Sequence, residues 1–198
     1  MIEVEKKFLL SGGQELSLVE GAESLGERVF EDEYFDDGKY SLTSRDMWLR
    51  RRNGRFELKT PLFVDGCERS VDQYDELEKE EEIRSALDIP ESGNLEQDLA
   101  KKSFFPFAKL TTTRKKFKKD GFILDFDIVD FGDSTYSIAE VEKMVEDKSQ
   151  MESAVSEILE FAQKHGLESA RVRGKVIEYV RRKNPDHFGV LIDCGICN

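Results

Sequence analysis

Charged and apolar residues alternate along many segments of this 198-residue chain. The clearest segment is FILDFDI at residues 122–128, where Asp125 and Asp127 alternate with phenylalanine, leucine and isoleucine. A period of two is that of a β-strand, because successive side chains of a strand point to opposite faces of the sheet. The apolar face must be covered by a core or by helices. The pattern therefore restricts the chain to sheets that have one apolar face and one charged face.

Like charges share a face on each of these segments. The opening stretch IEVEKKF places Glu3 and Glu5 on one face, with Lys7 beyond them. The later pairs are Arg50 with Arg52, Asp125 with Asp127, and Glu140 with Glu142. One interpretation of the opening strand is an ordinary outer face, whose charges discourage unwanted strand pairing. Because like charges repel unless opposite charges lie between them, the segregation favours a second interpretation, a barrel interior that holds a polyanion and a metal ion.

Turn and helix signals separate the strands. Asn53-Gly54 between two alternating runs, and Lys-Asp-Gly at 119–121, predict hairpins. Helices are expected at residues 15–25, 78–87, 95–104, 149–166 and 170–183, followed by a mobile tail at 184–198. The helix at 149–166 is the clearest, with a capping box at Ser149 and Glu152 and with Gly166 at its C-terminal end. The order of elements predicts an α+β fold in a single domain over residues 1–198.

The composition argues against several partners and locations. A net charge of −12 and a pI near 4.8 argue against general binding to nucleic acid or to anionic membranes, even for the basic segment at 109–119. No apolar run is long enough to span a bilayer and no signal region is apparent, so a cytoplasmic protein is expected. Its cysteines, Cys67, Cys194 and Cys197, are then expected to be reduced thiols.

The residue types on the charged faces indicate a chemistry. Carboxylate oxygens suit Mg²⁺ or Mn²⁺ rather than Zn²⁺. One arginine guanidinium can bind two phosphate oxygens at once, and a lysine ammonium adds a point charge. The cations available for a polyphosphate are Lys7, Arg50, Arg52, Lys59 and Arg114. Together these groups predict phosphoryl chemistry, in which the protein mainly positions a polyphosphate and neutralises its charge.

The E-x-E-x-K sequence formed by Glu3, Glu5 and Lys7 resembles the hallmark of the triphosphate tunnel metalloenzymes, also called CYTH domain proteins. The later motifs extend the likeness over nearly the whole chain: YFD at 34–36, WLRRR at 48–52, FELK at 56–59, LDFDIVDFG at 124–132 and AEVE at 139–142. The resemblance implies a closed tunnel of about eight antiparallel strands with a charged interior, flanked by helices. Within the family, the motifs are most similar to those of the animal thiamine triphosphatases. That likeness implies a monomer that hydrolyses thiamine triphosphate with Mg²⁺, or alternatively Mn²⁺.

The resemblance also implies a role for each site residue. The metal ligands would be Glu3, Glu5, Asp125, Glu140 and Glu142. The catalytic groups would be Glu3, Glu5, Lys7, Arg50, Arg52 and Arg114. The substrate-binding groups would be Lys7, Tyr34, Trp48, Arg50, Arg52, Lys59, Arg114 and Lys175. Trp48 would stack on the cationic thiazolium ring, although a lone tryptophan is equally consistent with a place in the core or at its rim. Glu76 and Asp127 carry no assigned role.

Two alternatives to thiamine triphosphate hydrolysis remain at this point. The first is an inorganic tripolyphosphatase or nucleoside triphosphatase of the same superfamily, for which Trp48 would matter little. The second is a polyphosphate-binding module without catalysis. Such a module needs the basic faces but not the five carboxylates, so the presence of all five argues against it.

Overall fold

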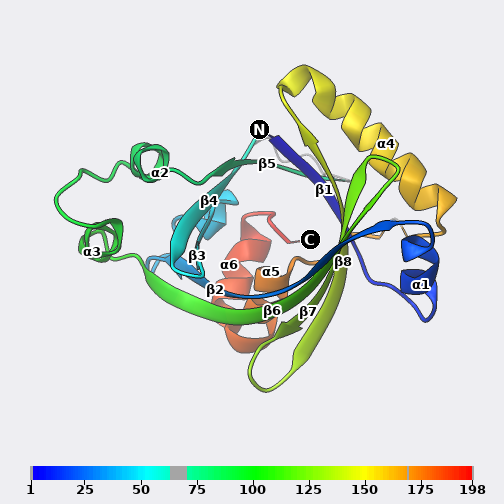
Figure 1. The fold of residues 1–198 in the computed structure, drawn as a ribbon. Helices are drawn as coiled ribbons and strands as arrows, with labels where there is room; N and C mark the ends of the chain where they lie inside the picture. The colour runs from blue at the N-terminus through cyan, green and yellow to red at the C-terminus, as the bar shows by residue number, and fades with distance from the viewer. Residues whose placement is uncertain (1, 63–70, 169, 198) are drawn as a thin grey trace. The chain divides into compact units, whose positions relative to one another are not determined.

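The computed structural model describes residues 2–62, 71–168 and 170–197 of the chain. The eight strands of this described part close into an antiparallel barrel in the order β1-β5-β4-β3-β2-β6-β7-β8, which confirms the predicted fold (Figure 1). The strands are β1 (Ile2–Phe8), β2 (Glu23–Asp36), β3 (Trp48–Arg52), β4 (Arg55–Pro61), β5 (Asp72–Leu77), β6 (Phe105–Lys119), β7 (Phe122–Asp130) and β8 (Thr135–Val145). The α-helices are α1 (Gln14–Val19), α2 (Glu80–Leu87), α3 (Leu95–Lys101), α4 (Met151–Lys164), α5 (Lys175–Lys183) and α6 (Pro185–Asp193). Two 3₁₀ turns are η1 (Thr43–Arg45) and η2 (Lys148–Gln150).

The described chain divides into two compact units, each assembled from three separate segments. Unit 1 consists of the described residues of Met1–Val29, Cys67–Tyr74 and Thr111–Lys175. Unit 2 consists of those of Phe30–Gly66, Asp75–Leu110 and Val176–Asn198. A search of the helices in the described residues finds none that is long and apolar enough to cross a membrane.

In unit 1, strand pairing gathers the charged residues on one face of the sheet. Glu5 lies opposite Glu142, Asp125 opposite Glu140, and Asp127 opposite Arg114 in the antiparallel registers of β1, β8, β7 and β6. Residues directly opposite each other in such a pair point to the same face. The alternation of each strand therefore adds up to one charged face across four strands.

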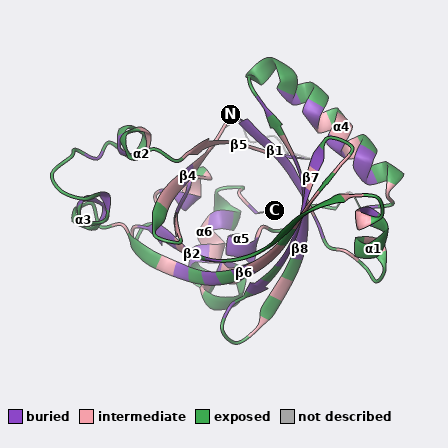
Figure 2. Cartoon of the chain, in the orientation of Figure 1, coloured by how far each residue is buried: buried purple, intermediate pink, exposed green. Residues whose placement is uncertain are grey.

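The other face of this sheet is apolar and is covered by α4, which lies along β1 and β8 (Figure 1). The helix buries one stripe and exposes the rest, as Figure 2 shows. Phe161 belongs to the buried stripe, and its ring centroid lies 4.8 Å from that of Phe122 on β7. Apolar contact with α4 thus fixes which face of the sheet carries the charges.

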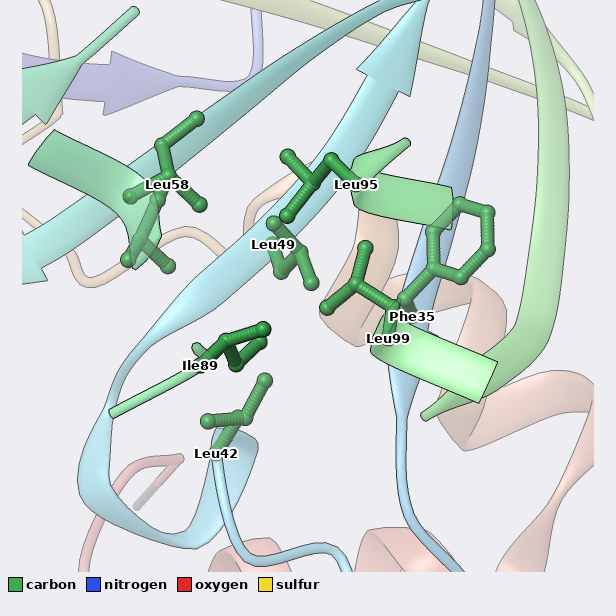
Figure 3. Packing of buried hydrophobic residues seen from close by; sticks show 8 residues of the cluster. Phe35, Leu42, Leu49, Leu58, Ile89, Leu95 and Leu99 are labelled. Atoms are coloured by element: carbon green, nitrogen blue, oxygen red, sulfur yellow. The ribbon is translucent and has the colours of Figure 1, made fainter. Parts of the chain in front are cut away.

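Unit 2 repeats this design. Phe35, Leu49 and Leu58 on β2, β3 and β4 are almost fully buried and pack with leucines and isoleucines contributed mainly by α2 and α3 (Figure 3). The opposite face carries charged and aromatic side chains. Tyr34 on β2 lies directly opposite Arg50 on β3, so their side chains point to this same face. Both units thus bury an apolar face under helices and keep a charged face on the other side.

Both predicted hairpins are present. Asn53 and Gly54 join β3 to β4 with φ values of 46° and 86°, and Asp120 and Gly121 join β6 to β7 with 52° and 85°. Positive φ at both central residues is what a two-residue type I′ turn requires, and Asn-Gly and Asp-Gly adopt it readily. The local turn chemistry therefore agrees with the strand pattern.

Two predicted helices at the N-terminal and central parts of the chain need correction. The helix expected at 15–25 ends at Val19, because Gly21 adopts a φ of 72° and the chain enters β2 at Glu23. The helix expected from 149 begins at Met151, after the turn η2. The predicted capping box at Ser149 is not formed: Asp147 caps the turn η2, accepting a hydrogen bond from the Ser149 amide at 2.8 Å, and the N-cap residue of α4, Gln150, makes no side-chain capping bond. Helix α4 stops just before Gly166, whose φ is 64°, as predicted.

The C-terminal region differs more from the prediction. The helix expected from 170 begins only at Lys175. Gly174, just before it, lies so close to Lys7 that a Cβ there would be 3.2 Å from Lys7 Cε. Part of the segment expected to be a mobile tail forms helix α6. Asn184 caps it and Pro185 opens it, a combination that favours a new helix. Within the described tail Cys194 is exposed and Cys197 is buried, whereas Cys67 lies outside the described residues.

Candidate active site

The charged face of unit 1 carries two overlapping clusters of buried carboxylates. Glu3, Glu5 and Glu142 form one cluster, and Asp125, Glu140 and Glu142 form the other. Within each cluster, one oxygen from every residue lies within 4.8 Å of the others. All five predicted metal ligands are therefore brought together by β1, β7 and β8.

Glu142, which belongs to both clusters, lies among other buried carboxylates. Burial first, and then the nearby carboxylates of Asp125, Glu3 and Glu140, raise the pKa of Glu142 well above its usual value. One buried oxygen of the site, Asp125 Oδ1, has no hydrogen-bond partner in the described structure. A buried carboxylate oxygen without a partner is costly, so this arrangement fits a bound cation.

Arg114 on β6 lies against the second cluster. Its Nε and Nη2 atoms donate to Asp127 at 2.6 and 2.7 Å, and Nη2 also donates to Glu140 Oε2 at 2.8 Å. A further, very short contact joins Nη1 to Asp125 Oδ2. Burial lowers the pKa of Arg114, but Glu140, Asp127 and Asp125 outweigh this effect and raise the pKa well above its usual value. The guanidinium therefore stays charged beside the candidate metal ligands.

Lys7 on β1 lies at the first cluster. Its Nζ atom is 2.5 Å from Glu5 Oε1 and 2.6 Å from Asp72 Oδ2 on β5. Burial lowers the pKa of Lys7, but the carboxylates of Asp72, Glu5 and Glu140 outweigh it and raise the pKa well above its usual value. Lys7 therefore lies beside the acids as a charged ammonium group.

Two further lysines lie on the charged face of unit 1. Lys175 Nζ is 3.5 Å from Asp127 Oδ2 and 3.4 Å from Thr112 Oγ1, and the lysine is buried. Lys116 Nζ is 3.1 Å from Asp125 Oδ2 and 3.6 Å from Glu142 Oε2. Lys175 is a predicted substrate-binding residue, whereas Lys116 has no predicted role.

In unit 2, Arg50 is held by two carboxylates. Its Nε atom donates to Glu57 Oε2 at 2.7 Å and its Nη2 atom to Glu76 Oε1 at 2.9 Å. Burial lowers the pKa of Arg50, yet Tyr34, Glu57 and Asp32 more than offset it, so the pKa lies well above its usual value. Glu76, which had no assigned role, is therefore a partner of Arg50.

Arg52 and Tyr34 lie on the same face of unit 2. Arg52 donates to both oxygens of the buried Asp32, at 2.7 and 3.0 Å, and its guanidinium lies 4.2 Å from the centre of the Phe30 ring. Burial, and next the charge of Asp32, raise the pKa of Tyr34. The Tyr34 phenol therefore remains protonated and able to donate a hydrogen bond.

Trp48 opens β3 on this face and lies opposite Lys59 on β4. Its indole Nε1 donates to Asp46 Oδ1 at 2.8 Å, and its side chain is buried, with the residue 6% exposed. The predicted substrate residues Tyr34, Trp48, Arg50, Arg52 and Lys59 therefore share one face of unit 2.

The carboxylates that hold the cations are not among the site residues predicted from the sequence. Asp32, Glu57 and Asp72 were not selected, although each pairs with a selected arginine or lysine. For Asp32 and Glu57 a signal existed, since both alternate in phase with residues of the charged face. Asp72 comes from a segment whose position against β1 cannot be read from local pattern.

Comparison with known proteins identifies relatives over nearly the full length of the chain. The CYTH domain model matches residues 1–174. The thiamine-triphosphatase of Homo sapiens is 30% identical in a comparison that covers 98% of this chain and 90% of that protein. The protein of the same name from Macaca fascicularis is 29% identical with the same coverage.

Solved structures share the fold at lower sequence identity. The PH1819 protein of Pyrococcus horikoshii superposes with a TM-score of 0.66 and 20% identity, covering 91% of this chain and 99% of that one. The putative adenylyl cyclase HpAC1 of Hippeastrum, whose structure is described as revealing a dominant triphosphatase activity, gives a TM-score of 0.56 at 20% identity and covers 94% and 98% of the two chains. With its barrel, its clustered carboxylates and the family match over most of its length, the chain belongs to the CYTH domain family, which includes triphosphatases.

Proposed function

We propose that this protein hydrolyses thiamine triphosphate to thiamine diphosphate and phosphate, with Mg²⁺ or Mn²⁺ as cofactor. The observation that carries the proposal is the pair of buried carboxylate clusters that share Glu142, with Arg114 and Lys116 beside them. Such a set suits a hard divalent cation and phosphate oxygens at the same place. The choice of substrate is supported by the two primate relatives named thiamine-triphosphatase, at 30% and 29% identity.

The cation would be held by the two clusters of unit 1. The unpartnered oxygen of Asp125 and the all-oxygen donor set fit Mg²⁺ or Mn²⁺. When bound, such an ion polarises phosphate oxygens and lowers the pKa of a coordinated water. The residues that would hold it are Glu3, Glu5, Asp125, Glu140 and Glu142.

The reaction needs one bond to form and one to break. The oxygen of a water molecule forms a bond to the terminal phosphorus, and the bond from that phosphorus to the bridging oxygen breaks, which leaves thiamine diphosphate. A carboxylate of the clusters orients the water and takes its proton. Arg114 and Lys7, which remain charged in their buried sites, neutralise charge on the phosphate oxygens as it develops.

The charged face of unit 2 carries the other residues that the family resemblance assigns to the substrate. Arg50, Arg52 and Lys59 are assigned to the phosphates, and Tyr34 and Trp48 to the organic end. The chemical reason is that an indole attracts a flat cation such as the thiazolium ring. This assignment rests on the resemblance to the family and on the shared face of these residues.

Inorganic tripolyphosphate is a second candidate, and one observation favours it. The Trp48 side chain is buried, with the residue 6% exposed, which limits the indole surface that a ring can contact. A substrate without a ring does not need that surface. The carboxylate clusters and cations would serve it equally well.

Phosphate release separates these candidates. The purified protein is assayed with Mg²⁺ and equal low concentrations of thiamine triphosphate, tripolyphosphate and ATP. A clear preference for thiamine triphosphate supports the proposal, whereas a preference for tripolyphosphate selects the second candidate. Absence of release from all three contradicts both, and leaves a polyphosphate-binding module.

A further inference from the structure

The segment between β2 and β3 places a carboxylate beside the only tryptophan of the chain. Asp46 follows η1 with a φ of 60°, and its amide donates to the Thr43 carbonyl at 3.0 Å. Its Oδ1 atom accepts the indole hydrogen bond of Trp48 at 2.8 Å. An indole has a single donor, so this bond restricts the rotation of the ring about its side-chain bonds.

The same segment is tied to the end of β2 by one buried side chain. Asp36 accepts hydrogen bonds from the Leu42 amide at 3.0 Å, from the Thr43 amide at 2.8 Å and from the Thr43 hydroxyl at 2.7 Å. Asp36 is 4% exposed. The backbone that leads to Asp46 is therefore anchored and not merely an exposed loop.

Helix α6 supplies a second anchor through His187, which is fully buried. Its Nε2 atom lies 2.8 Å from Thr43 Oγ1, and its ring stacks on Tyr40 with centroids 3.8 Å apart and an angle of 5°. The Thr43 hydroxyl gives its only hydrogen to Asp36, a carboxylate that can only accept. His187 Nε2 must therefore carry a hydrogen and donate it to Thr43.

We propose that Asp46 is a positioning residue that fixes the plane of the Trp48 indole for the flat cationic ring of the substrate, and that His187 of α6 holds the segment that presents Asp46. The inference rests on the proposed function and extends it, since it identifies residues that set specificity without touching phosphate. Part of this support lies beyond residue 174, where the match to the family model ends. Recognition of the organic end would thus depend on the C-terminal helix.

The test uses the emission of Trp48, which is unique in the sequence. Asp46→Gly removes the acceptor, and glycine adopts the φ of 60° without strain, whereas Asp46→Asn keeps an acceptor oxygen. Lys39→Gly, at an exposed position of the same segment, is the matched control. Emission anisotropy should fall in Asp46→Gly and be unchanged in the other two variants. His187→Leu should also lower it. Unchanged anisotropy in Asp46→Gly overturns the positioning role, whatever the substrate is.

The ligand arm of the test measures quenching of the same emission by thiamine diphosphate, together with steady-state kinetics. Asp46→Gly should weaken the quenching and raise the KM for thiamine triphosphate about three- to tenfold, the range expected for a partly lost cation–π contact. The kcat/KM for tripolyphosphate, which has no ring, should change far less. If wild-type protein is quenched and Asp46→Gly is quenched equally, the inference is wrong while the proposed function stands. If the wild type prefers tripolyphosphate and is not quenched, the thiamine assignment and the ring-positioning role are both wrong.

Discussion

Arg114 holds Asp127 with two hydrogen bonds, from Nε at 2.6 Å and from Nη2 at 2.7 Å, while the same Nη2 reaches Glu140 at 2.8 Å. A single guanidinium thus bridges carboxylates of β7 and β8. Burial raises the pKa of Asp127, but Arg114 and Lys175 outweigh it and lower the pKa below its usual value. The arginine therefore serves as an internal counter-ion for part of the acidic site.

Replacing Arg114 by alanine should have opposite effects on catalysis and on metal binding. Loss of a group that stabilises developing charge should lower kcat/KM by about 10²–10³-fold. The carboxylates that Arg114 holds would be left uncompensated, so Mn²⁺ should bind more tightly without substrate, as measured by electron paramagnetic resonance. Lys115→Ala, one residue along β6 and on the other face, should change neither quantity. Weaker Mn²⁺ binding by Arg114→Ala would contradict the counter-ion role.

Glu142→Gln should remove metal binding more completely than any other single amide substitution in the clusters. Glu142 is the one residue that belongs to both carboxylate clusters found among the described residues. Its loss should abolish Mn²⁺ binding detectable by calorimetry and lower activity by about 10²-fold or more. The exposed Glu146 offers a control, Glu146→Gln, on the same stretch of chain. Wild-type Mn²⁺ affinity in Glu142→Gln would show that the ion binds elsewhere.

Without metal, the stability of the fold should fall as the pH rises above the ordinary pKa of a glutamate. Burial and neighbouring carboxylates raise the pKa of Glu142 in the folded chain, so the folded state binds more protons than the unfolded state over that window. Stability then decreases with pH from about 4.3 up to the raised pKa. Melting temperatures measured in EDTA across this range should show the decline. Glu142→Gln should flatten it, and a slope of opposite sign in the wild type would refute the assignment.

Trp48→Ala should separate the two candidate substrates. If the indole contacts the thiazolium ring, the KM for thiamine triphosphate should rise about tenfold. The kcat/KM for tripolyphosphate should stay near the wild-type value, because the phosphate-binding arginines are unchanged. Steady-state kinetics on both substrates measure the difference. Equal losses on both would mean that Trp48 supports the fold of unit 2 and does not recognise a ring.

Leu49→Ala should destabilise the protein without touching the charged face. Leu49 is 1% exposed and lies in the core of unit 2, on the opposite side of β3 from Arg50. Removing a buried leucine side chain costs about 2–5 kcal/mol of unfolding free energy. Urea denaturation measures this loss, and Leu16→Ala, at a position 76% exposed, provides the comparison. A loss under about 1 kcal/mol would show that the site repacks.

The charged faces could be predicted from sequence because strand alternation is a local rule. Asp125 and Asp127 share one face of their strand, and apolar side chains occupy the other face. The apolar face is therefore the one that helices must cover. The same rule placed Glu3, Glu5, Arg50 and Arg114 correctly. It needs no knowledge of which strands are neighbours.

The partners of these residues could not be predicted in the same way. Asp72 reaches Lys7 across 65 positions of sequence, and Glu76 reaches Arg50 across 26. Such contacts depend on strand order, which local patterns do not encode. Helix α6 was missed because Asn184-Pro185 was interpreted as the end of ordered structure, although the same pair is a good helix start.

Strand β1 pairs with β8 one residue at a time from Ile2 to Phe8. Each side chain of β1 therefore points either to the face with the acidic clusters or to the apolar face under α4. Substitutions within the strand act one position at a time. Inserting or deleting a single residue between Ile2 and Phe8 would exchange the two environments for every residue on one side of the change. The number of residues in this strand is therefore constrained independently of the chemistry of its individual side chains.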